Sequence, residues 1–317
     1  MILVNLLAFC ISAFLNNKLI PLIINYCEKK GIFDIPEANK QKSIPKVRFG
    51  GVSIFLSYFV AAILGILILK FNFYISNQII FIVFLFIPFI FLLGLLDDIY
   101  KLSPFIRLIF QLLISFLACL SGLLIDTKNI SFFELIPGSD SFFVFLSFIV
   151  TMIWITGLIN AFNWLDGLDG LASGFASISS LVLMILSFQS SNPFALLLST
   201  LILGTSISFL KYNFYPSKIL MGDSGSNFLG FSLAIVSIMV FSKENIFYFE
   251  RMLILFIVPV LDMIFVIFSR MISRQSPFKG DTRHLHYRLL NLGISYKKTI
   301  YIMYFLFVLC GALCLNF

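Results

Sequence analysis

Charged side chains are scarce in this chain. Asp, Glu, Lys and Arg make up 12% of the 317 residues, where an average soluble domain has about 25%. Hydrophobic residues rise to 60%, against about 45–50% in ordinary proteins. The polar connections between apolar runs are at most about 20 to 30 residues long, which is too short for a separate soluble domain. We therefore interpret residues 1–317 as one integral membrane domain.

Cysteine and histidine are also rare, with five and two residues. Four cysteines lie inside apolar runs and one lies at the end of a run, without ligand-like spacing. We interpret them as small hydrophobic residues rather than disulfides or a metal site. His284 and His286 have no cysteine or third histidine nearby, which argues against a closed structural zinc site.

Apolar runs of the length that crosses a bilayer, about 20 residues, recur along the whole chain. The first run is too long, and too weakly basic ahead of its apolar part, for a cleaved signal peptide. About ten spans are predicted, at residues 2–25, 49–69, 78–96, 105–125, 142–160, 171–188, 194–210, 225–241, 252–270 and 299–317.

The basic residues predict an orientation. Most of the 22 lysines and arginines lie on one side of the predicted membrane, by about four to one, and the positive-inside rule makes that side cytoplasmic and both termini extracytoplasmic. The same side holds both histidines and a set of acids: Asp97, Asp98, Asp166, Asp169, Asp223 and Asp281. The predicted fold class is all-α, a polytopic membrane protein with its active site on the cytoplasmic face.

Two neighbouring acids, Asp97 and Asp98, end the third predicted span in LLGLLDDIYKLSP. Adjacent carboxylates at a membrane edge repel each other unless a cation or a shared proton compensates. Mg²⁺ prefers oxygen ligands and keeps waters for phosphate, so it fits such a pair. A solvated helix end, where the acids only mark the interface, is an equally weighted alternative.

The stretch NAFNWLDGLDGLASG carries a second polar set, Asn160, Asn163, Asp166 and Asp169, at every third residue. At about 100° per residue this spacing predicts one slowly rotating polar stripe along a helix end. The interleaved glycines allow a ligand or another helix to approach closely. Helix capping is the simpler explanation, but one cap needs one such residue and the stripe has four.

A third candidate motif, MGDSGSN, contains Asp223, which is predicted to lie in a tight turn just before the span at 225–241. Small neighbours suit the approach of a metal or a phosphate, and an N-cap role is compatible with both. Upstream, Lys46 and Arg48 precede a Gly-Gly pair in SIPKVRFGGVSIF. Positive-inside flanking accounts for these two charges without a site.

The stretch GDTRHLHYRLLNLG places His284 and His286 among the cations Lys279, Arg283 and Arg288. This pattern predicts an anion site for a diphosphate, with a basic interfacial helix on lipid headgroups as an equal alternative.

One further acid, Asp262, lies eight residues before Arg270 inside the ninth span. An intramembrane acid is a functional candidate, and a structural hydrogen bond to a neighbouring helix is the alternative.

Together, these residues are suited to phosphoryl transfer from a soluble, phosphate-rich donor at the membrane surface, with a lipid phosphate as the acceptor. In their order from IPKVRFGG to HLHYRLLNLG, the motifs resemble the polyprenyl-phosphate N-acetylhexosamine-1-phosphate transferase family. That family includes the enzymes that start O-antigen, enterobacterial common antigen and wall teichoic acid, and the MurNAc-pentapeptide translocase of peptidoglycan.

The resemblance implies that a UDP-N-acetyl sugar gives its sugar-1-phosphate to undecaprenyl phosphate in a bacterial plasma membrane, with release of UMP. It implies Mg²⁺ as the cofactor, with Mn²⁺ as an alternative, no nucleic-acid partner, and a homodimer as an open option. The implied catalytic residues are Asp97, Asp98 and Asp223, with Asp98 and Asp223 on the metal. The implied substrate-binding residues are Lys46, Arg48, Asn160, Asn163, Asp166, Asp169, Arg283, His284, His286 and Arg288.

Three positions depart from the family pattern. Tyr287 replaces the last histidine of H-x-H-H, Leu220 replaces a frequent Phe before M-G-D, and PKVR replaces P-x-P-R. The DTRHLHYRLL loop resembles the GlcNAc-type branch, so a UDP-GlcNAc-like donor is preferred over UDP-MurNAc-pentapeptide. A nucleotide-sugar or lipid transporter and a non-catalytic lipid-binding relative are weaker alternatives, because most charges gather at one face and the key acids are present.

Overall fold

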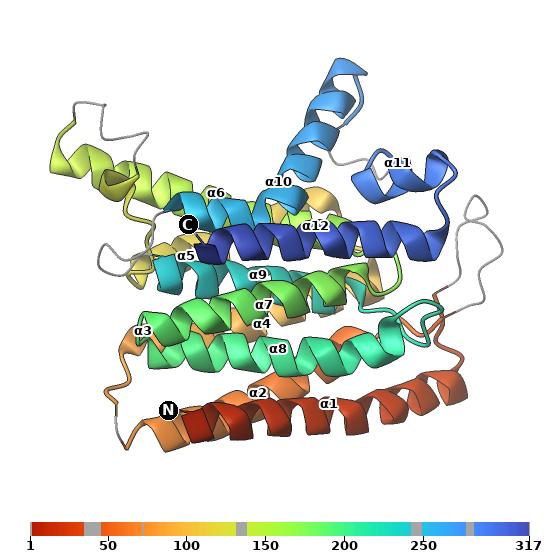
Figure 1. Cartoon of the computed structure of the whole chain (residues 1–317), viewed down its shortest axis with the longest axis horizontal. Helices are drawn as coiled ribbons and strands as arrows, with labels where there is room; N and C mark the ends of the chain where they lie inside the picture. Colours follow the sequence, from red (N-terminus) through yellow and green to blue (C-terminus); the bar gives the residue numbers. More distant parts are fainter. Residues whose placement is uncertain are drawn as a thin grey trace.

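The described parts of the chain are built almost wholly from helices (Figure 1). The computed structural model describes residues 2–34, 46–71, 73–130, 138–241, 249–276 and 282–316. Within them, extended pairing is limited to two isolated bridges. The elements are α1 Ile2–Lys30, α2 Gly50–Leu69, α3 Asn77–Phe81, the π-helical η1 Ile82–Phe86, α4 Ile87–Tyr100, α5 Pro104–Leu120, the 3₁₀ turn η2 Thr127–Asn129, α6 Asp140–Leu165, α7 Leu171–Gln189, α8 Pro193–Asn213, α9 Gly222–Phe241, α10 Phe249–Ile272, α11 Leu285–Asn291 and α12 Tyr296–Asn316.

The all-α, polytopic class predicted from the sequence is confirmed. Among the described residues, nine helices are long and apolar enough to cross a membrane, counting Asn77–Tyr100 as one. The fourth predicted span, at 105–125, is not among these nine and corresponds to the shorter apolar helix α5, which ends at Leu120. At about 1.5 Å per residue α5 is some 25 Å long, close to the thickness of the hydrocarbon core.

Helix α9 forms the centre of the bundle, and its membrane-spanning window is fully buried. Small residues on α9 and its neighbours let the backbones approach closely, as is usual inside membranes. A Cβ added at Gly51 of α2 would meet the backbone nitrogen of Gly225, and one added at Gly94 of α4 would meet the carbonyl oxygen of Asp223. The start of α9 is therefore held directly between α2 and α4.

Three helix boundaries next to the candidate acids differ from the sequence prediction. α6 continues five residues past the predicted end at 160, because Asn160 and Asn163 find hydrogen-bond partners on other helices. α4 continues through both acids to Tyr100, and α9 begins at Gly222, so Asp223 lies in its first turn rather than before it. The third span also contains the π-helical turn η1 just before Pro88, whose missing N–H removes one helical hydrogen bond.

The two ends of the bundle differ in character. Figure 1 shows α1 beginning and α12 ending at one end, while α4 ends and α9 begins toward the other. The C-terminal part of α10 leaves the bundle at an angle, with α11 beside it (Figure 1). Pro259 lies inside α10 and accounts for a bend at this point, because it cannot donate to the helical ladder.

Candidate active site

A short extended segment before α2 forms one wall of the site. Its backbone is paired with the segment before α9: Leu220 N–H donates to the Val47 carbonyl over 2.7 Å, and Gly50 N–H donates to the Leu220 carbonyl over 3.0 Å. This pairing fixes the two basic residues of the segment, Lys46 and Arg48, next to the start of α9. Pro45 lies outside the described residues.

Asp98 binds the N-terminus of α9. One of its carboxylate oxygens accepts the backbone N–H of Asp223 over 2.8 Å, and the other accepts that of Ser224 over 2.9 Å. Its side chain is 0% exposed. A carboxylate at this position satisfies two unpaired helix donors and interacts favourably with the helix dipole. Both oxygens of Asp98 are thus already occupied by hydrogen-bond donors.

Arg48 connects the carboxylates of α4 and α9. Its Nε lies 3.1 Å from an Asp98 oxygen and its Nη2 lies 2.8 Å from an Asp223 oxygen. A third acid, Asp34, lies 3.7 Å from Nη1. Burial disfavours the charged guanidinium, but the carboxylates of Asp223 and Asp98 outweigh burial and raise the pKa of Arg48. Arg48 is therefore a fixed positive charge at the centre of the site.

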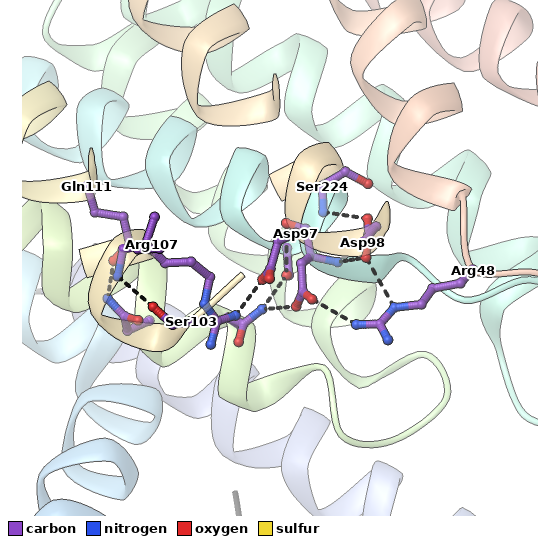
Figure 2. A network of polar contacts seen from close by, with 12 residues as sticks. Arg48, Asp97, Asp98, Ser103, Arg107, Gln111 and Ser224 are labelled. Carbon is purple, nitrogen blue, oxygen red and sulfur yellow. Dashed lines mark hydrogen bonds and ion pairs between the residues drawn. The ribbon is translucent and has the colours of Figure 1, made fainter. Parts of the chain in front are cut away.

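Asp97 faces a different cation from its neighbour Asp98. Its oxygen accepts a hydrogen bond from Arg107 over 2.6 Å (Figure 2). The tight turn after α4 makes this contact, because α5 reverses direction at its N-cap Ser103 and brings Arg107 back beside Asp97. The carboxyl group of Asp97 also lies close enough to that of Asp223 for the two to interact.

Figure 2 shows that the two acids at the end of α4 face different partners. Asp98 lies between Arg48 and the backbone of Ser224, while Asp97 points toward Arg107. From the sequence, the two adjacent acids were predicted to act together as one pair of carboxylates. In the structure, Asp98 is enclosed and fully bonded, whereas Asp97 and Asp223 approach each other.

Of the two asparagines at the end of α6, only Asn163 reaches the site. Its amide donates to Asp223 over 2.6 Å and to the Ser226 hydroxyl over 2.9 Å. Asn160, one helical turn earlier, donates to Gln111 of α5 and to the Thr156 carbonyl. Asn160 therefore joins α5 to α6 and does not contact the acids of the site.

The predicted four-residue stripe ends earlier than expected. Asp166 is the C-cap of α6, and Asp169 lies beyond the helix, so the helical spacing does not extend to it. Asp169 is buried and accepts Lys46 Nζ over 2.8 Å and the backbone N–H of Ser217 over 3.0 Å. Lys46 and Asp169, two of the residues predicted to bind substrate, thus bind each other. Burial, together with the Asp223 carboxylate, raises the pKa of Asp166 well above its usual value.

The histidine-containing segment covers the loop between α6 and α7. Tyr287 donates to the Gly167 carbonyl over 3.1 Å, and a Cβ added at Gly167 would come within 2.5 Å of the His286 Nε2 atom. His286 is 0% exposed, and among the residues that the structure describes neither of its ring nitrogens has a hydrogen-bond partner. The two histidine rings are stacked, with their centroids 5.6 Å apart.

The arginines predicted to line an anion site are held elsewhere. Arg283 donates to the hydroxyls of Ser269 and Ser273 and to Gln275, near the C-terminal end of α10. The guanidinium of Arg288 lies 4.2 Å from the centre of the Phe265 ring. Lys279 and Asp281 lie outside the described residues.

Three contributors were missed as site residues. The sequence motifs do not point to Arg107, Ser217 or Tyr296, which contact Asp97, Lys46 and Asp169 respectively. Arg107 had a sequence signal: it lies ten residues after Asp97, across a turn and an S-P helix start. Tyr296, whose oxygen accepts the Asp169 backbone N–H over 2.6 Å, had none.

The burial of His286 predicts that the protein loses folding stability at acidic pH. Burial, and then the neighbouring His284, lower the pKa of His286 to about 3, from about 6.5 in an unfolded chain. The folded protein therefore binds fewer protons than the unfolded chain between these two values, and stability falls as the pH drops below 6.5. At pH 5 we expect a loss of about 2 kcal/mol relative to neutral pH.

Thermal unfolding in detergent at pH 7.5 and pH 5 measures this loss. The matched variant is His286→Gln, which cannot be protonated. Its unfolding midpoint should change less with pH than that of the wild type. Equal pH dependence in the two proteins would show that His286 is not the group responsible.

The fold and the site define a multi-pass helical membrane protein whose acids and cations gather where α4 ends and α9 begins. Residues 79–241 match the family model described as glycosyl transferase family 4. The chain is 31% identical over 303 residues to the probable undecaprenyl-phosphate N-acetylglucosaminyl 1-phosphate transferase of Bacillus subtilis, covering 94% of this chain and 80% of that protein.

Two further relatives align over most of their length. One is the undecaprenyl-phosphate alpha-N-acetylglucosaminyl 1-phosphate transferase of Thermotoga maritima, 30% identical over 88% of this chain and 79% of that protein. The other is the phospho-N-acetylmuramoyl-pentapeptide-transferase of Bacillus subtilis, 31% identical over 90% of this chain and 88% of that protein. The chain belongs to glycosyl transferase family 4.

Proposed function

We propose that this protein transfers N-acetylhexosamine-1-phosphate from a UDP-sugar to undecaprenyl phosphate, releasing UMP and starting a lipid-linked cell-envelope glycan. The relatives named as undecaprenyl-phosphate N-acetylglucosaminyl 1-phosphate transferases support this reaction and favour UDP-GlcNAc as the donor. The surplus of cations in the connections at the site end supports a cytoplasmic location of the site and an extracytoplasmic location of both termini.

The observation that carries the proposal is the convergence of Asp97, Asp223, Asn163 and Arg48 at one end of the bundle. They come from four separate parts of the chain. Transfer of a phosphoryl group needs cations against the phosphate oxygens and an acceptor held in line with the leaving group. A site at the end of transmembrane helices can meet a soluble nucleotide on one side and a lipid phosphate on the other.

The chemistry of this cluster fits Mg²⁺, with Mn²⁺ as an alternative. Two carboxyl groups in contact, those of Asp97 and Asp223, repel each other unless a cation or a proton lies between them. Asp98 is a weaker candidate ligand than the sequence suggested, because N–H donors already occupy both its oxygens. We therefore assign the ion to Asp97 and Asp223, where it would neutralise negative charge on the transferred phosphate.

An incomplete set of protein ligands is compatible with this assignment. Within the described ranges, no group of three or more His, Cys, Asp or Glu side chains is arranged to hold a metal ion. Mg²⁺ commonly uses one or two carboxylates and completes its coordination with water and substrate phosphates.

The remaining residues bind and orient the substrates in this proposal. Arg48 is a fixed cation beside Asp223 and is placed to face the donor phosphates. Arg107, whose charge faces Asp97, lies at the start of α5 and is placed to face the lipid phosphate. His286 is neutral at pH 7 because its pKa is about 3, so it serves as a hydrogen-bonding group for the donor rather than as a cation.

The test is an assay with the purified full-length protein, undecaprenyl phosphate and Mg²⁺. UDP-GlcNAc, UDP-GalNAc and UDP-MurNAc-pentapeptide are compared as donors, and both UMP and the sugar diphospholipid are measured. We expect turnover with UDP-GlcNAc. Turnover with UDP-MurNAc-pentapeptide alone would reassign the donor, and no product from any UDP-sugar would overturn the proposal.

A further inference from the structure

Asp262 of α10 is attached to the histidine segment by two hydrogen bonds. One of its oxygens lies 2.9 Å from His284 Nδ1, and the other accepts the backbone N–H of Leu285 over 2.7 Å. The Asp262 side chain is only 11% exposed, and that of His284 is 6% exposed. Arg288 Nη2, in the same segment, lies 3.8 Å from the oxygen that accepts the Leu285 N–H. A buried carboxylate with these three partners fixes both the ring of His284 and the first turn of α11.

His284 in turn packs against two further aromatic rings, those of Trp164 and His286. On one side, the His284 ring packs edge-on against Trp164 of α6, with ring centroids 5.4 Å apart, and the Arg270 guanidinium lies 4.9 Å from the centre of the Trp164 ring. On the other side, His284 stacks on His286. Asp262 therefore connects α10 to the end of α6 and to the buried ring of His286.

The group at the end of this connection is His286, whose two ring nitrogens have no hydrogen-bond partner within the described part of the chain. A fully buried imidazole without a hydrogen-bond partner is unfavourable unless it is used for binding. Its Nε2 atom is directed at the Gly167 position, where a side chain would collide with it. Gly167 follows Asp166 in the loop between α6 and α7, which also carries Asp169. The orientation of His286 is thus set by its neighbours rather than by bonds of its own.

We propose that Asp262 is a positioning residue, which acts through His284 and the Leu285 N–H to hold His286 against the loop at Gly167. What His286 meets there, the donor UDP-sugar, rests on the proposed function. The positioning itself does not. The intramembrane acid seen in the sequence thereby gains a role away from the reacting atoms.

Chemical modification of histidine tests the positioning without any assay of activity. His284 and His286 are the only histidines in the chain, so the histidine adducts of diethyl pyrocarbonate, assigned residue by residue by mass spectrometry, report on them alone, provided the affinity tag has none. We expect slow labelling in the wild type, and labelling at least about tenfold faster in Asp262→Ala, since the segment is released. Asp262→Glu, which keeps the carboxylate, should lie between the two.

Two further variants isolate one hydrogen bond. Leu285 is the first residue of α11 and His284 before it is extended (φ −61°, ψ 151°), so proline is tolerated at 285. Proline removes the N–H together with the leucine side chain, and alanine removes the side chain alone. Leu285→Pro should label faster than Leu285→Ala, which keeps the N–H. Asp140→Asn, at an acid 91% exposed at the start of α6, is the control for loss of a carboxylate. Equal labelling of Asp262→Ala, Asp140→Asn and the wild type would overturn the proposal.

Kinetics separate positioning from general instability. In Asp262→Asn we expect kcat/KM for the UDP-sugar to fall about 10–100-fold, which is typical when a residue that orients a binding group is removed. The loss should lie mainly in the KM for the UDP-sugar, with the KM for undecaprenyl phosphate unchanged. A uniform loss of kcat with both KM values unchanged, as partial unfolding would produce, contradicts the positioning role.

The two proposals fail in different ways. If the wild type turns over no UDP-sugar but Asp262→Ala still exposes both histidines, the proposed function is wrong and the positioning stands. If the wild type is active and Asp262→Asn matches it in both labelling and KM, the positioning is wrong and the proposed function stands.

Discussion

Replacing Asp223 by Asn is expected to lower kcat/KM by at least about 1000-fold, the loss typical when a group that stabilises transition-state charge is removed. Asp223 is the acid on which the site converges: Arg48, Asn163 and the Asp97 carboxyl all approach it. Asparagine keeps the shape and one acceptor oxygen, so the hydrogen bond from Asn163 can remain. The negative charge that would attract the proposed divalent cation is lost.

The same replacement should leave stability almost unchanged. It relieves the repulsion between Asp223 and Asp97, and it weakens the ion pair with Arg48, which are opposing effects of similar size. Steady-state release of UMP and thermal unfolding in detergent are measured side by side, with Asp140→Asn as the control. Activity of Asp223→Asn within tenfold of the wild type would contradict its role.

The Mg²⁺ dependence of the residual activity of Asp223→Asn provides a second test of the role of Asp223. If Asp223 holds the ion, the concentration of Mg²⁺ that gives half-maximal activity should rise in Asp223→Asn. A raised requirement would support the assignment to Asp97 and Asp223, and an unchanged one would place the ion elsewhere.

The fold class could be predicted from the sequence because it depends on composition and run length. Apolar runs of about 20 residues must be helices in a bilayer, where each backbone donor and acceptor needs a partner within its own segment. The ends of the helices could not be predicted equally well. α6 runs on through Asn160 because Gln111 of α5 accepts its amide hydrogen, and that partner lies 49 residues away.

The membership of the site was predicted better than its pairing. Motif order and orientation rules suggested that Asp97, Asp98, Asp223 and the histidine segment face one side, and the structure brings the three acids together. Which cation faces which acid depends on how separate segments pack. The backbone pairing of Val47 with Ile219 and Leu220 decides where Arg48 lies, and no local pattern encodes it.

The roles of Asp98 and Asp262 show why spacing alone is insufficient. Two adjacent acids look equivalent in the sequence, yet successive residues of a helix point about 100° apart. Asp98 therefore meets the N-terminus of α9, while Asp97 meets Arg107. Asp262 appeared to be isolated in a span, and only the return of the segment after α10 gives it His284 as a partner.

Replacing Asp98 by Asn is expected to destabilise the protein by about 3–5 kcal/mol, the range for breaking a buried charged pair. The side chain is 0% exposed, and its two oxygens accept the N–H groups of Asp223 and Ser224 as well as Arg48 Nε. Asparagine offers one oxygen and turns an NH₂ group toward a second donor. One backbone donor would remain buried without an acceptor, which is costly in a low-dielectric interior, and Arg48 Nε would lose the negative charge it faces.

Activity should fall as well, because the first turn of α9 carries Asp223 and loses the group that holds it. The expected signature differs from that of Asp223→Asn: the unfolding midpoint drops, while the residual activity keeps the wild-type Mg²⁺ requirement. Asp98→Asn and Asp223→Asn are therefore compared in one thermal series and one Mg²⁺ titration. A stable Asp98→Asn protein with a raised Mg²⁺ requirement would restore Asp98 as a metal ligand. A destabilised one with the wild-type requirement would identify it as the carboxylate that fixes the start of α9, and with it the position of Asp223.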